Sequence, residues 1–186
     1  MTTSPYDEGL LCHVCDGQRP VMDECSACAG RGRITGIGFV DAPWNEVAHG
    51  LWVGGHDYAL DHRVLPAVVR DEFDVVVSLF ARDGHGPDEG VEHHHYRIPD
   101  AQLEAEDVED ISRLAGLVAE RLEEGRTVLV RCQAGLNRSS LVAALALVHR
   151  GWQPQEAIDA IRGARSQNCL FNRSFVSHVL SAQAPP

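Results

Sequence analysis

From Asn45 onward, short apolar runs alternate with longer segments whose apolar residues recur at helical spacing. The runs at 73–80 and 127–132 carry consecutive β-branched apolar residues, which is typical of strands buried on both faces. Helical spacing is regular over 107–124, and 135–150 is a strongly apolar segment that opens on glycine. Strand–helix alternation of this kind predicts an α/β fold in which helices flank a central, mostly parallel sheet.

Weaker patterns predict the other elements of the same domain. We expect strands at 47–55, ending in a Gly-Gly turn, and at 91–99. Apolar residues that would share one face predict a helix at 60–70. A proline near the first turn supports a helix at 154–164, and a last helix is expected at about 172–182.

The first forty residues differ from the rest of the chain. They hold four of the six cysteines and show no periodic apolar pattern. With so few large apolar residues, this segment needs a staple or the support of the main domain in order to fold. We therefore divide the chain into a Cys-rich segment at 1–40 and a larger domain at 41–186.

The charge balance excludes some classes of partner. All sixteen basic residues are arginine, and 27 acidic residues give a net charge of −11. An excess of acid repels polyanions, so we expect neither nucleic-acid nor anionic-membrane binding. The sequence has no apolar run of 18 residues and no pattern of a signal peptide. We expect a cytoplasmic protein whose cysteines are metal ligands, a nucleophile or core thiols rather than disulfides.

The stretch around Cys132 carries the most chemical information. A buried strand is predicted to end at Cys132, and Arg138 and Ser139 open the apolar helix that follows. Backbone N–H groups of a loop in this position, together with the helix dipole, favour a bound anion and lower the pKa of a thiol. Arg138 offers a planar fork of donors suited to phosphate oxygens, and Ser139 can donate to the sulfur. The predicted phosphate-binding loop comprises Gln133, Ala134, Gly135, Leu136 and Asn137.

The spacing of Cys132 and Arg138 is weak evidence by itself, because Cys25 and Arg31 share it. No predicted strand precedes Cys25, and no apolar helix follows Arg31. The sequence context therefore distinguishes Cys132 from the chance match.

The motif Cys132-x-Ala134-Gly135-x-x-Arg138-Ser139 resembles the signature loop of the cysteine-dependent protein tyrosine phosphatases, and within them the dual-specificity group. The resemblance extends over about 44–182. It implies that Cys132 attacks phosphorus to form a phosphocysteine, while Arg138 and the loop amides hold the phosphoryl oxygens and Ser139 assists release of the thiolate. It also implies chemistry without a metal, on a phosphoprotein or a small phosphomonoester.

The family mechanism also needs a general acid on a separate loop. Asp100 lies 32 positions before Cys132, at the family's usual spacing, and is the predicted acid. Glu104, Glu106 and Asp107 are interpreted instead as the lead-in and first turn of the next helix, where acids suit the dipole.

One departure from the family concerns Arg131, because the family usually has His before the cysteine. An arginine could supply positive charge to the thiolate, with a different geometry. Arg131 is the only sequence support for the first alternative, a pseudophosphatase that binds phosphorylated partners without turnover. A second alternative is an RNA 5′-triphosphatase-like enzyme, since Gly135-Leu136-Asn137-Arg138 also resembles that group. A third is a sulfur transferase, which would not need Asp100.

Two Cys-x2-Cys pairs lie nine residues apart in the Cys-rich segment. Four thiolates in such pairs can surround one tetrahedral zinc ion, and the expected ligands are Cys12, Cys15, Cys25 and Cys28. The pairs and their glycines resemble the zinc-binding repeat of DnaJ-type chaperones over 12–33. This resemblance implies a structural zinc, and the alternative is a redox pair or unliganded thiols.

Three other features receive plain structural interpretations. His93, His94 and His95 are not expected to hold a metal ion, because adjacent strand residues point to opposite faces. They are expected to be solvated, as His runs on edge strands commonly are. Arg165 and Arg173 are expected to form surface pairs with carboxylates. Cys169 is expected to be a small core residue.

Overall fold

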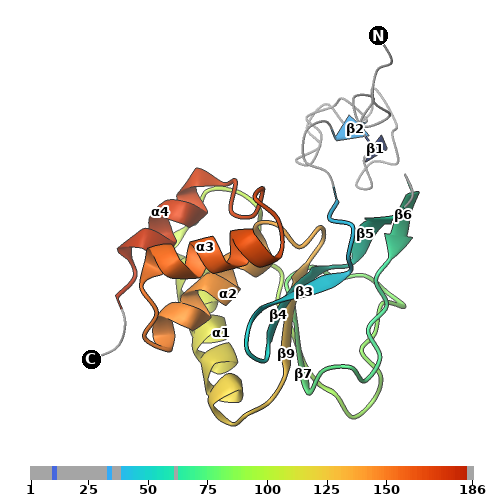
Figure 1. Cartoon of the computed structure of the whole chain (residues 1–186), viewed down its shortest axis with the longest axis horizontal. Helices are drawn as coiled ribbons and strands as arrows, with labels where there is room; N and C mark the ends of the chain where they lie inside the picture. The colour runs from blue at the N-terminus through green and yellow to red at the C-terminus, as the bar shows by residue number, and fades with distance from the viewer. Residues whose placement is uncertain (1–9, 12–32, 35–38, 61–62, 184–186) are drawn as a thin grey trace.

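The computed structural model describes residues 10–11, 33–34, 39–60 and 63–183, and its centre is a five-stranded sheet (Figure 1). The strands in spatial order are β3 (Trp44–Ala48), β4 (Leu51–Gly55), β9 (Val128–Cys132), β7 (Val75–Ser78) and β8 (Glu92–His95). Only β3 pairs antiparallel with its neighbour, and the other three pairs are parallel. The prediction of a central, mostly parallel sheet is confirmed.

Four helices of the described chain pack on one face of this sheet (Figure 1). They are α1 (Ala105–Glu123), α2 (Arg138–His149), α3 (Pro154–Ala164) and α4 (Arg173–Ser181). Strand residues alternate between two faces, so Val128 and Val130 join the helix-covered core. Leu129 points the other way, into a smaller cluster with Val76 and Phe73.

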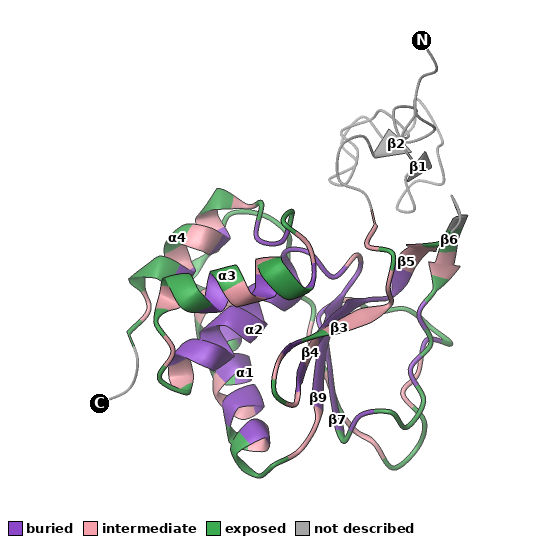
Figure 2. Cartoon of the chain, viewed as in Figure 1, coloured by how far each residue is buried: buried purple, intermediate pink, exposed green. Residues whose placement is uncertain are grey.

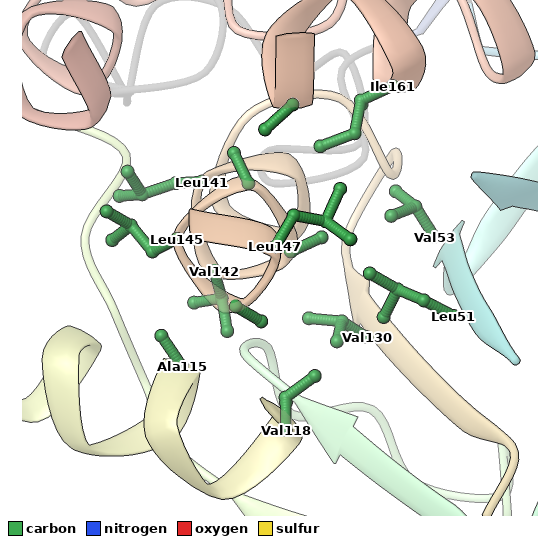
Figure 3. Close-up of a cluster of buried hydrophobic side chains, with 14 of the residues drawn as sticks. Leu51, Val53, Ala115, Val118, Val130, Leu141, Val142, Leu145, Leu147 and Ile161 are labelled. Carbon is green, nitrogen blue, oxygen red and sulfur yellow. The ribbon is translucent and has the colours of Figure 1, made fainter. Parts of the chain in front are cut away.

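Helix α2 lies at the centre of the helical layer and is buried along almost its whole length (Figure 2). Its apolar side chains contact α1 at Ala115 and Val118, β4 at Leu51, and α3 at Ile161 (Figure 3). A helix that is apolar all round is stable only inside such surroundings. Because α2 begins at the end of the Cys132 loop, this burial holds one end of the loop in place.

The predicted helix at 60–70 is wrong. Strands β5 (Asp57–Leu60) and β6 (Arg63–Pro66) form an antiparallel hairpin there, with Leu60 45% exposed. Pro66 would lie inside the predicted helix, where its ring clashes with the preceding turn and it cannot donate a hydrogen bond. The predicted single strand at 47–55 is also two strands, β3 and β4, joined by a turn in which Gly50 has φ of +76°.

The other predicted elements are confirmed, with ends that move by a few residues. Two further short strands, β1 (Leu10–Leu11) and β2 (Arg33–Ile34), pair antiparallel. No helix in the described ranges has the length and apolar character needed to cross a membrane.

Candidate active site

The loop that joins β9 to α2 is anchored on the end of β4. The His56 N–H donates to the carbonyl oxygens of Cys132, at 2.9 Å, and Gln133, at 2.8 Å. Gly135 has φ of +70°, and a Cβ there would lie 2.5 Å from the carbonyl carbon of Gly54. Only glycine fits such a left-handed position against another backbone, as the motif predicts.

Cys132 ends β9 with its thiol buried and its Sγ 3.3 Å from the Ser139 hydroxyl. Burial acts to raise the pKa of this thiol, and the Asp100 carboxylate acts in the same direction. The charge of Arg138 and hydrogen bonds from the Ser139 hydroxyl and backbone outweigh them, so the pKa of Cys132 is lowered from its ordinary value. The thiol is therefore prepared to act as a thiolate nucleophile.

Arg138 is the first residue of α2, directly after the same loop. Its guanidinium carbon is 5.6 Å from the centre of the Phe80 ring, a cation–π distance. Its Nε is buried, has no hydrogen-bond partner within the described part of the chain, and is 3.8 Å from Asp100 Oδ2. A buried N–H without a partner is costly, so this donor is prepared for an anion's oxygen.

Asp100 reaches this loop from the segment between β8 and α1. Asn137 Nδ2 donates to its Oδ1 at 3.0 Å. Glu104 and Asp107, by contrast, form a reciprocal capping box at the start of α1, and Glu106 lies exposed in its first turn. The structure thus assembles Cys132 and Asp100 with Arg138 and Ser139, and the interpretation of the rival acids as a helix start is confirmed.

The prediction of a surface pair at Arg165 is wrong, because its side chain is 5% exposed and bonds to no carboxylate in the described structure. It donates to the carbonyl oxygens of Gly135, at 3.3 Å, and Ala134, at 3.4 Å. It also donates to the Asn45 side chain in β3, at 2.6 Å, and to the Ala42 carbonyl, at 2.7 Å. Burial lowers the pKa of Arg165 to about 10.

Sequence reasoning missed this role of Arg165, although a signal was present. Arg165 follows the buried Ile161 by four positions and so continues the apolar face of α3. Arg173 differs, since it lies exposed at the start of α4.

Arg131 is adjacent to Cys132 but points to the opposite face of the sheet. It is 1% exposed and donates to Ser78 Oγ at 2.9 Å and to the carbonyl oxygens of His85, at 2.8 Å, and Gly86, at 2.6 Å. Burial lowers the pKa of Arg131 to about 10. This arginine therefore ties the 81–90 loop to the sheet, and its donors are directed at neutral oxygens rather than at the thiolate.

Metal ligation is not supported in the described ranges, where no group of three or more His, Cys, Asp or Glu side chains could hold an ion. His93 instead contacts the Ser78 hydroxyl at 2.9 Å, and His94 contacts Glu92 at 2.7 Å. The four predicted zinc ligands, Cys12, Cys15, Cys25 and Cys28, lie outside the described residues.

Known proteins are similar to this chain in sequence or in fold. The family model "Dual specificity phosphatase, catalytic domain" matches residues 62–184. Cyclin-dependent kinase inhibitor 3 of Rattus norvegicus is 34% identical over 83 residues, which cover 44% of this chain and 38% of that protein. The Sus scrofa protein of the same name matches equally. The chain spans about two fifths of the length of the curated relatives that it matches.

Solved structures show the same fold. Human DUSP28 superposes with a TM-score of 0.60 at 21% identity, over 77% of this chain and 94% of that chain. PTPMT1 in complex with PI(5)P superposes with a TM-score of 0.56 at 17% identity, over 75% and 93%. Since the family model covers most of the chain and the cysteine loop has the geometry described above, this chain belongs to the family of dual specificity phosphatase catalytic domains.

Proposed function

We propose that the chain is a phosphomonoester hydrolase, a cysteine-based protein tyrosine or dual-specificity phosphatase. The observation that carries this proposal is the placement of the Cys132 thiol, with its lowered pKa, 3.3 Å from Ser139 in a loop that also presents Arg138. Asp100 comes to the same loop from another part of the chain. Nucleophile, anion site and acid are the three parts that the reaction requires.

In the first step, the Cys132 thiolate attacks phosphorus, forming an S–P bond while the P–O bond to the leaving group breaks. Asp100 gives its proton to the leaving oxygen, which would otherwise depart as a poor leaving group. Arg138 and the N–H groups of the loop donate to the phosphoryl oxygens throughout. The Nε of Arg138, which is buried without a hydrogen-bond partner in the described part of the chain, is available as one of these donors.

In the second step, a water molecule attacks the phosphocysteine and gives a proton to Asp100. The S–P bond breaks and phosphate leaves with the new oxygen. Cys132 departs as a thiolate, which the Ser139 hydroxyl stabilises by donating a hydrogen bond across the 3.3 Å contact. Asp100 then holds the proton that it needs for the next cycle.

The neutral side chains of the loop support a proposal for the substrate class. Gln133, Ala134, Leu136 and Asn137 add no positive charge beside Arg138. A site with a single cationic fork suits one phosphoryl group better than a polyphosphorylated ligand. We propose a phosphoprotein or a small phosphomonoester as substrate. The match to PTPMT1, at 17% identity, speaks to the fold alone.

Hydrolysis of an aryl phosphate by the wild type and by Cys132→Ser, with EDTA present, tests the proposal. We expect turnover by the wild type and none by the variant. Folded wild type that binds a phosphate analogue without turnover would support the pseudophosphatase alternative. Release of phosphate from 5′-triphosphate RNA in preference to aryl phosphate would support the RNA 5′-triphosphatase alternative. Sulfur transfer that survives Asp100→Asn would support the third alternative.

We also propose a structural zinc held by Cys12, Cys15, Cys25 and Cys28. Four thiolates suit tetrahedral zinc. Strands β1 and β2, which flank the four cysteines in the sequence, pair antiparallel and so bring the two ends of this segment together. Elemental analysis of the purified protein should give one zinc per chain. The double variant that carries Cys12→Ser and Cys25→Ser should contain no zinc. A metal-free wild type of equal thermal stability would contradict the proposal.

We also propose that the protein is located in the cytoplasm. Cys132 and Cys169 are free thiols, and a thiolate nucleophile works in a reducing compartment. Recovery of the native protein in the soluble cytoplasmic fraction is the expected result, and recovery from an oxidising compartment would contradict it.

A further inference from the structure

Asn137, the residue that precedes α2, uses both ends of its side-chain amide. It is 1% exposed, its Nδ2 donates to Asp100 Oδ1 at 3.0 Å, and its Oδ1 accepts from the Asn172 N–H at 3.3 Å. The side chain does not cap α2, whose first turn it could otherwise serve. Its hydrogen bonds are directed instead to two segments outside the phosphate-binding loop.

Asn172, which lies in the second of these segments, also contacts the stretch of chain that carries Asp100. Asn172 Nδ2 donates to the Ala101 carbonyl oxygen at 3.0 Å. Its Oδ1 accepts from the Ser174 N–H at 3.0 Å and so caps α4. Asn172 is therefore fixed by a helix start, and Asn137 is fixed by Asn172. The backbone around Asp100 is held through a chain of hydrogen bonds that ends on two helices.

The chemistry of an amide suits this place. Asn137 Nδ2 can donate to Asp100 Oδ1 whether or not the acid carries its proton, because the side-chain amide does not ionise at ordinary pH and keeps its N–H donors. With Oδ1 occupied by Asn137, the proton belongs on Oδ2. Oδ2 is the oxygen 3.8 Å from Arg138 Nε, and hence the one that faces the phosphoryl site.

We propose that Asn137 is a positioning residue for the general acid: it orients Asp100 so that Oδ2 delivers the proton to the leaving oxygen. The inference rests on the proposed phosphatase function. It adds a side-chain role to Asn137, which was expected to act only as part of the phosphate-binding loop. The predicted consequence is selective. Loss of Asn137 should matter most for substrates whose leaving group must be protonated.

The test is kcat/KM for a series of aryl phosphates whose phenols range from strongly acidic to weakly acidic. In Asn137→Ala, we expect kcat/KM for phenyl phosphate, the ester with the poorest leaving group, to fall by roughly tenfold or more relative to that for the most activated ester. A fall of this size corresponds to the loss of part of a general-acid contribution. Asn137→Ser should behave alike, because serine suits a helix N-cap but is too short to replace the donor. It keeps the test available if alanine impairs folding.

A matched control is Gln155→Ala. Gln155 also donates an amide hydrogen bond to an aspartate, Asp159 Oδ1 at 2.9 Å, on the exposed side of α3. The leaving-group dependence of this variant should equal that of the wild type. In an Asp100→Asn background, Asn137→Ala should add no further leaving-group dependence, because the two changes act through one acid.

The outcomes separate the two proposals. If Asn137→Ala lowers kcat/KM equally for every ester, Asn137 supports the loop only, and the positioning role is overturned while the phosphatase function stands. Additional leaving-group dependence in the Asp100→Asn background would also overturn it. If the wild type hydrolyses no ester, both the function and the positioning role fail together.

Discussion

Arg165 donates a hydrogen bond to the Gly135 carbonyl oxygen at 3.3 Å, although the two residues are 30 positions apart in the chain. Gly135 is the turn of the phosphate-binding loop, with φ of +70°. Arg165 lies just after α3 and also bonds to Asn45 in β3. The shape of the loop therefore depends on a buried cation outside the signature motif.

Replacing this cation should weaken both fold and activity. In Arg165→Met, buried carbonyl oxygens lose their donor, so we expect the free energy of unfolding to fall by about 2 kcal/mol. The loop would also lose alignment, and kcat/KM should fall by about 10-fold to 100-fold. Urea unfolding and aryl phosphate kinetics measure the two effects. Arg150→Met, at the exposed end of α2, is the control, and equal behaviour of both variants would refute the prediction.

Arg131 should support stability without setting the reactivity of the thiol. Arg131→Met removes the donors to Ser78, His85 and Gly86, so we expect a loss of about 2 kcal/mol in unfolding free energy. The pKa of Cys132 should stay near the wild-type value, whereas Arg138→Met should raise it. The rate of iodoacetamide alkylation against pH gives both values. A rise in Arg131→Met as large as that in Arg138→Met would show that the charge of Arg131 acts on the thiolate.

Ser139 should act mainly in the second step of the reaction. Without its hydroxyl, the departing Cys132 thiolate loses a charge-assisted hydrogen bond, so hydrolysis of the phosphocysteine should slow by about 10-fold to 100-fold. Ser139→Ala should then give a burst of nitrophenol followed by slow turnover in stopped-flow measurements. The control is Ser181→Ala, whose hydroxyl donates to the His178 carbonyl at the end of α4. A Ser139→Ala enzyme whose burst slows as much as its turnover would contradict this assignment.

Two glycines should respond oppositely to alanine. A Cβ at Gly55 would lie 2.7 Å from the carbonyl oxygens of Asp57 and Gln133, so Gly55→Ala should displace the loop and cost about 2 kcal/mol. Gly163, inside α3, has no such neighbour within 4 Å, and Gly163→Ala should stabilise by about 0.5–1 kcal/mol. Thermal unfolding of both variants is the measurement, and a neutral Gly55→Ala would mean that β4 tolerates a side chain beneath the loop.

Acid should destabilise the protein through His56. Burial, then the charges of Arg131 and His85, lower the pKa of this imidazole to about 3, and a smaller lowering comes from Arg82. The Phe80 carbonyl opposes them, accepting from Nε2 at 2.9 Å. Because the unfolded chain binds the proton with an ordinary pKa near 6.5, stability is complete above that pH and is lost as pH falls toward about 3.

For one such group, the free energy of unfolding changes by at most about 1.4 kcal/mol per pH unit. We therefore measure the free energy of unfolding in urea at pH 7 and at pH 5. Its decrease from pH 7 to pH 5 should be about 2 kcal/mol smaller in His56→Gln than in the wild type. Some dependence remains in the variant, since burial also lowers the pKa of His85. An unchanged loss in His56→Gln would exclude His56 as its source.

Local pattern was enough where an element is buried against a continuous core, on one face for α3 and on both faces for β7 and β9. The helix expected at 154–164 has those bounds in the structure, and the runs at 73–80 and 127–132 contain β7 and β9. Pattern failed at 60–70, where helical spacing arose by coincidence and Pro66 opposed it. Hydrophobic spacing predicts burial, but the apolar face expected here is mostly exposed in the structure, where Leu60, Val64 and Val68 are 45%, 39% and 37% exposed.

The chemical groups of the candidate site could be predicted from the sequence: Cys132, Arg138 and Ser139 belong to one loop motif, and the family resemblance pointed to Asp100. The roles of the two buried arginines depend on the fold, because Arg131 holds the 81–90 loop and Arg165 holds the phosphate-binding loop through carbonyl oxygens that are distant in the chain. Burial of a cation depends on carbonyl oxygens brought together from distant segments, and that convergence exists only in the folded chain.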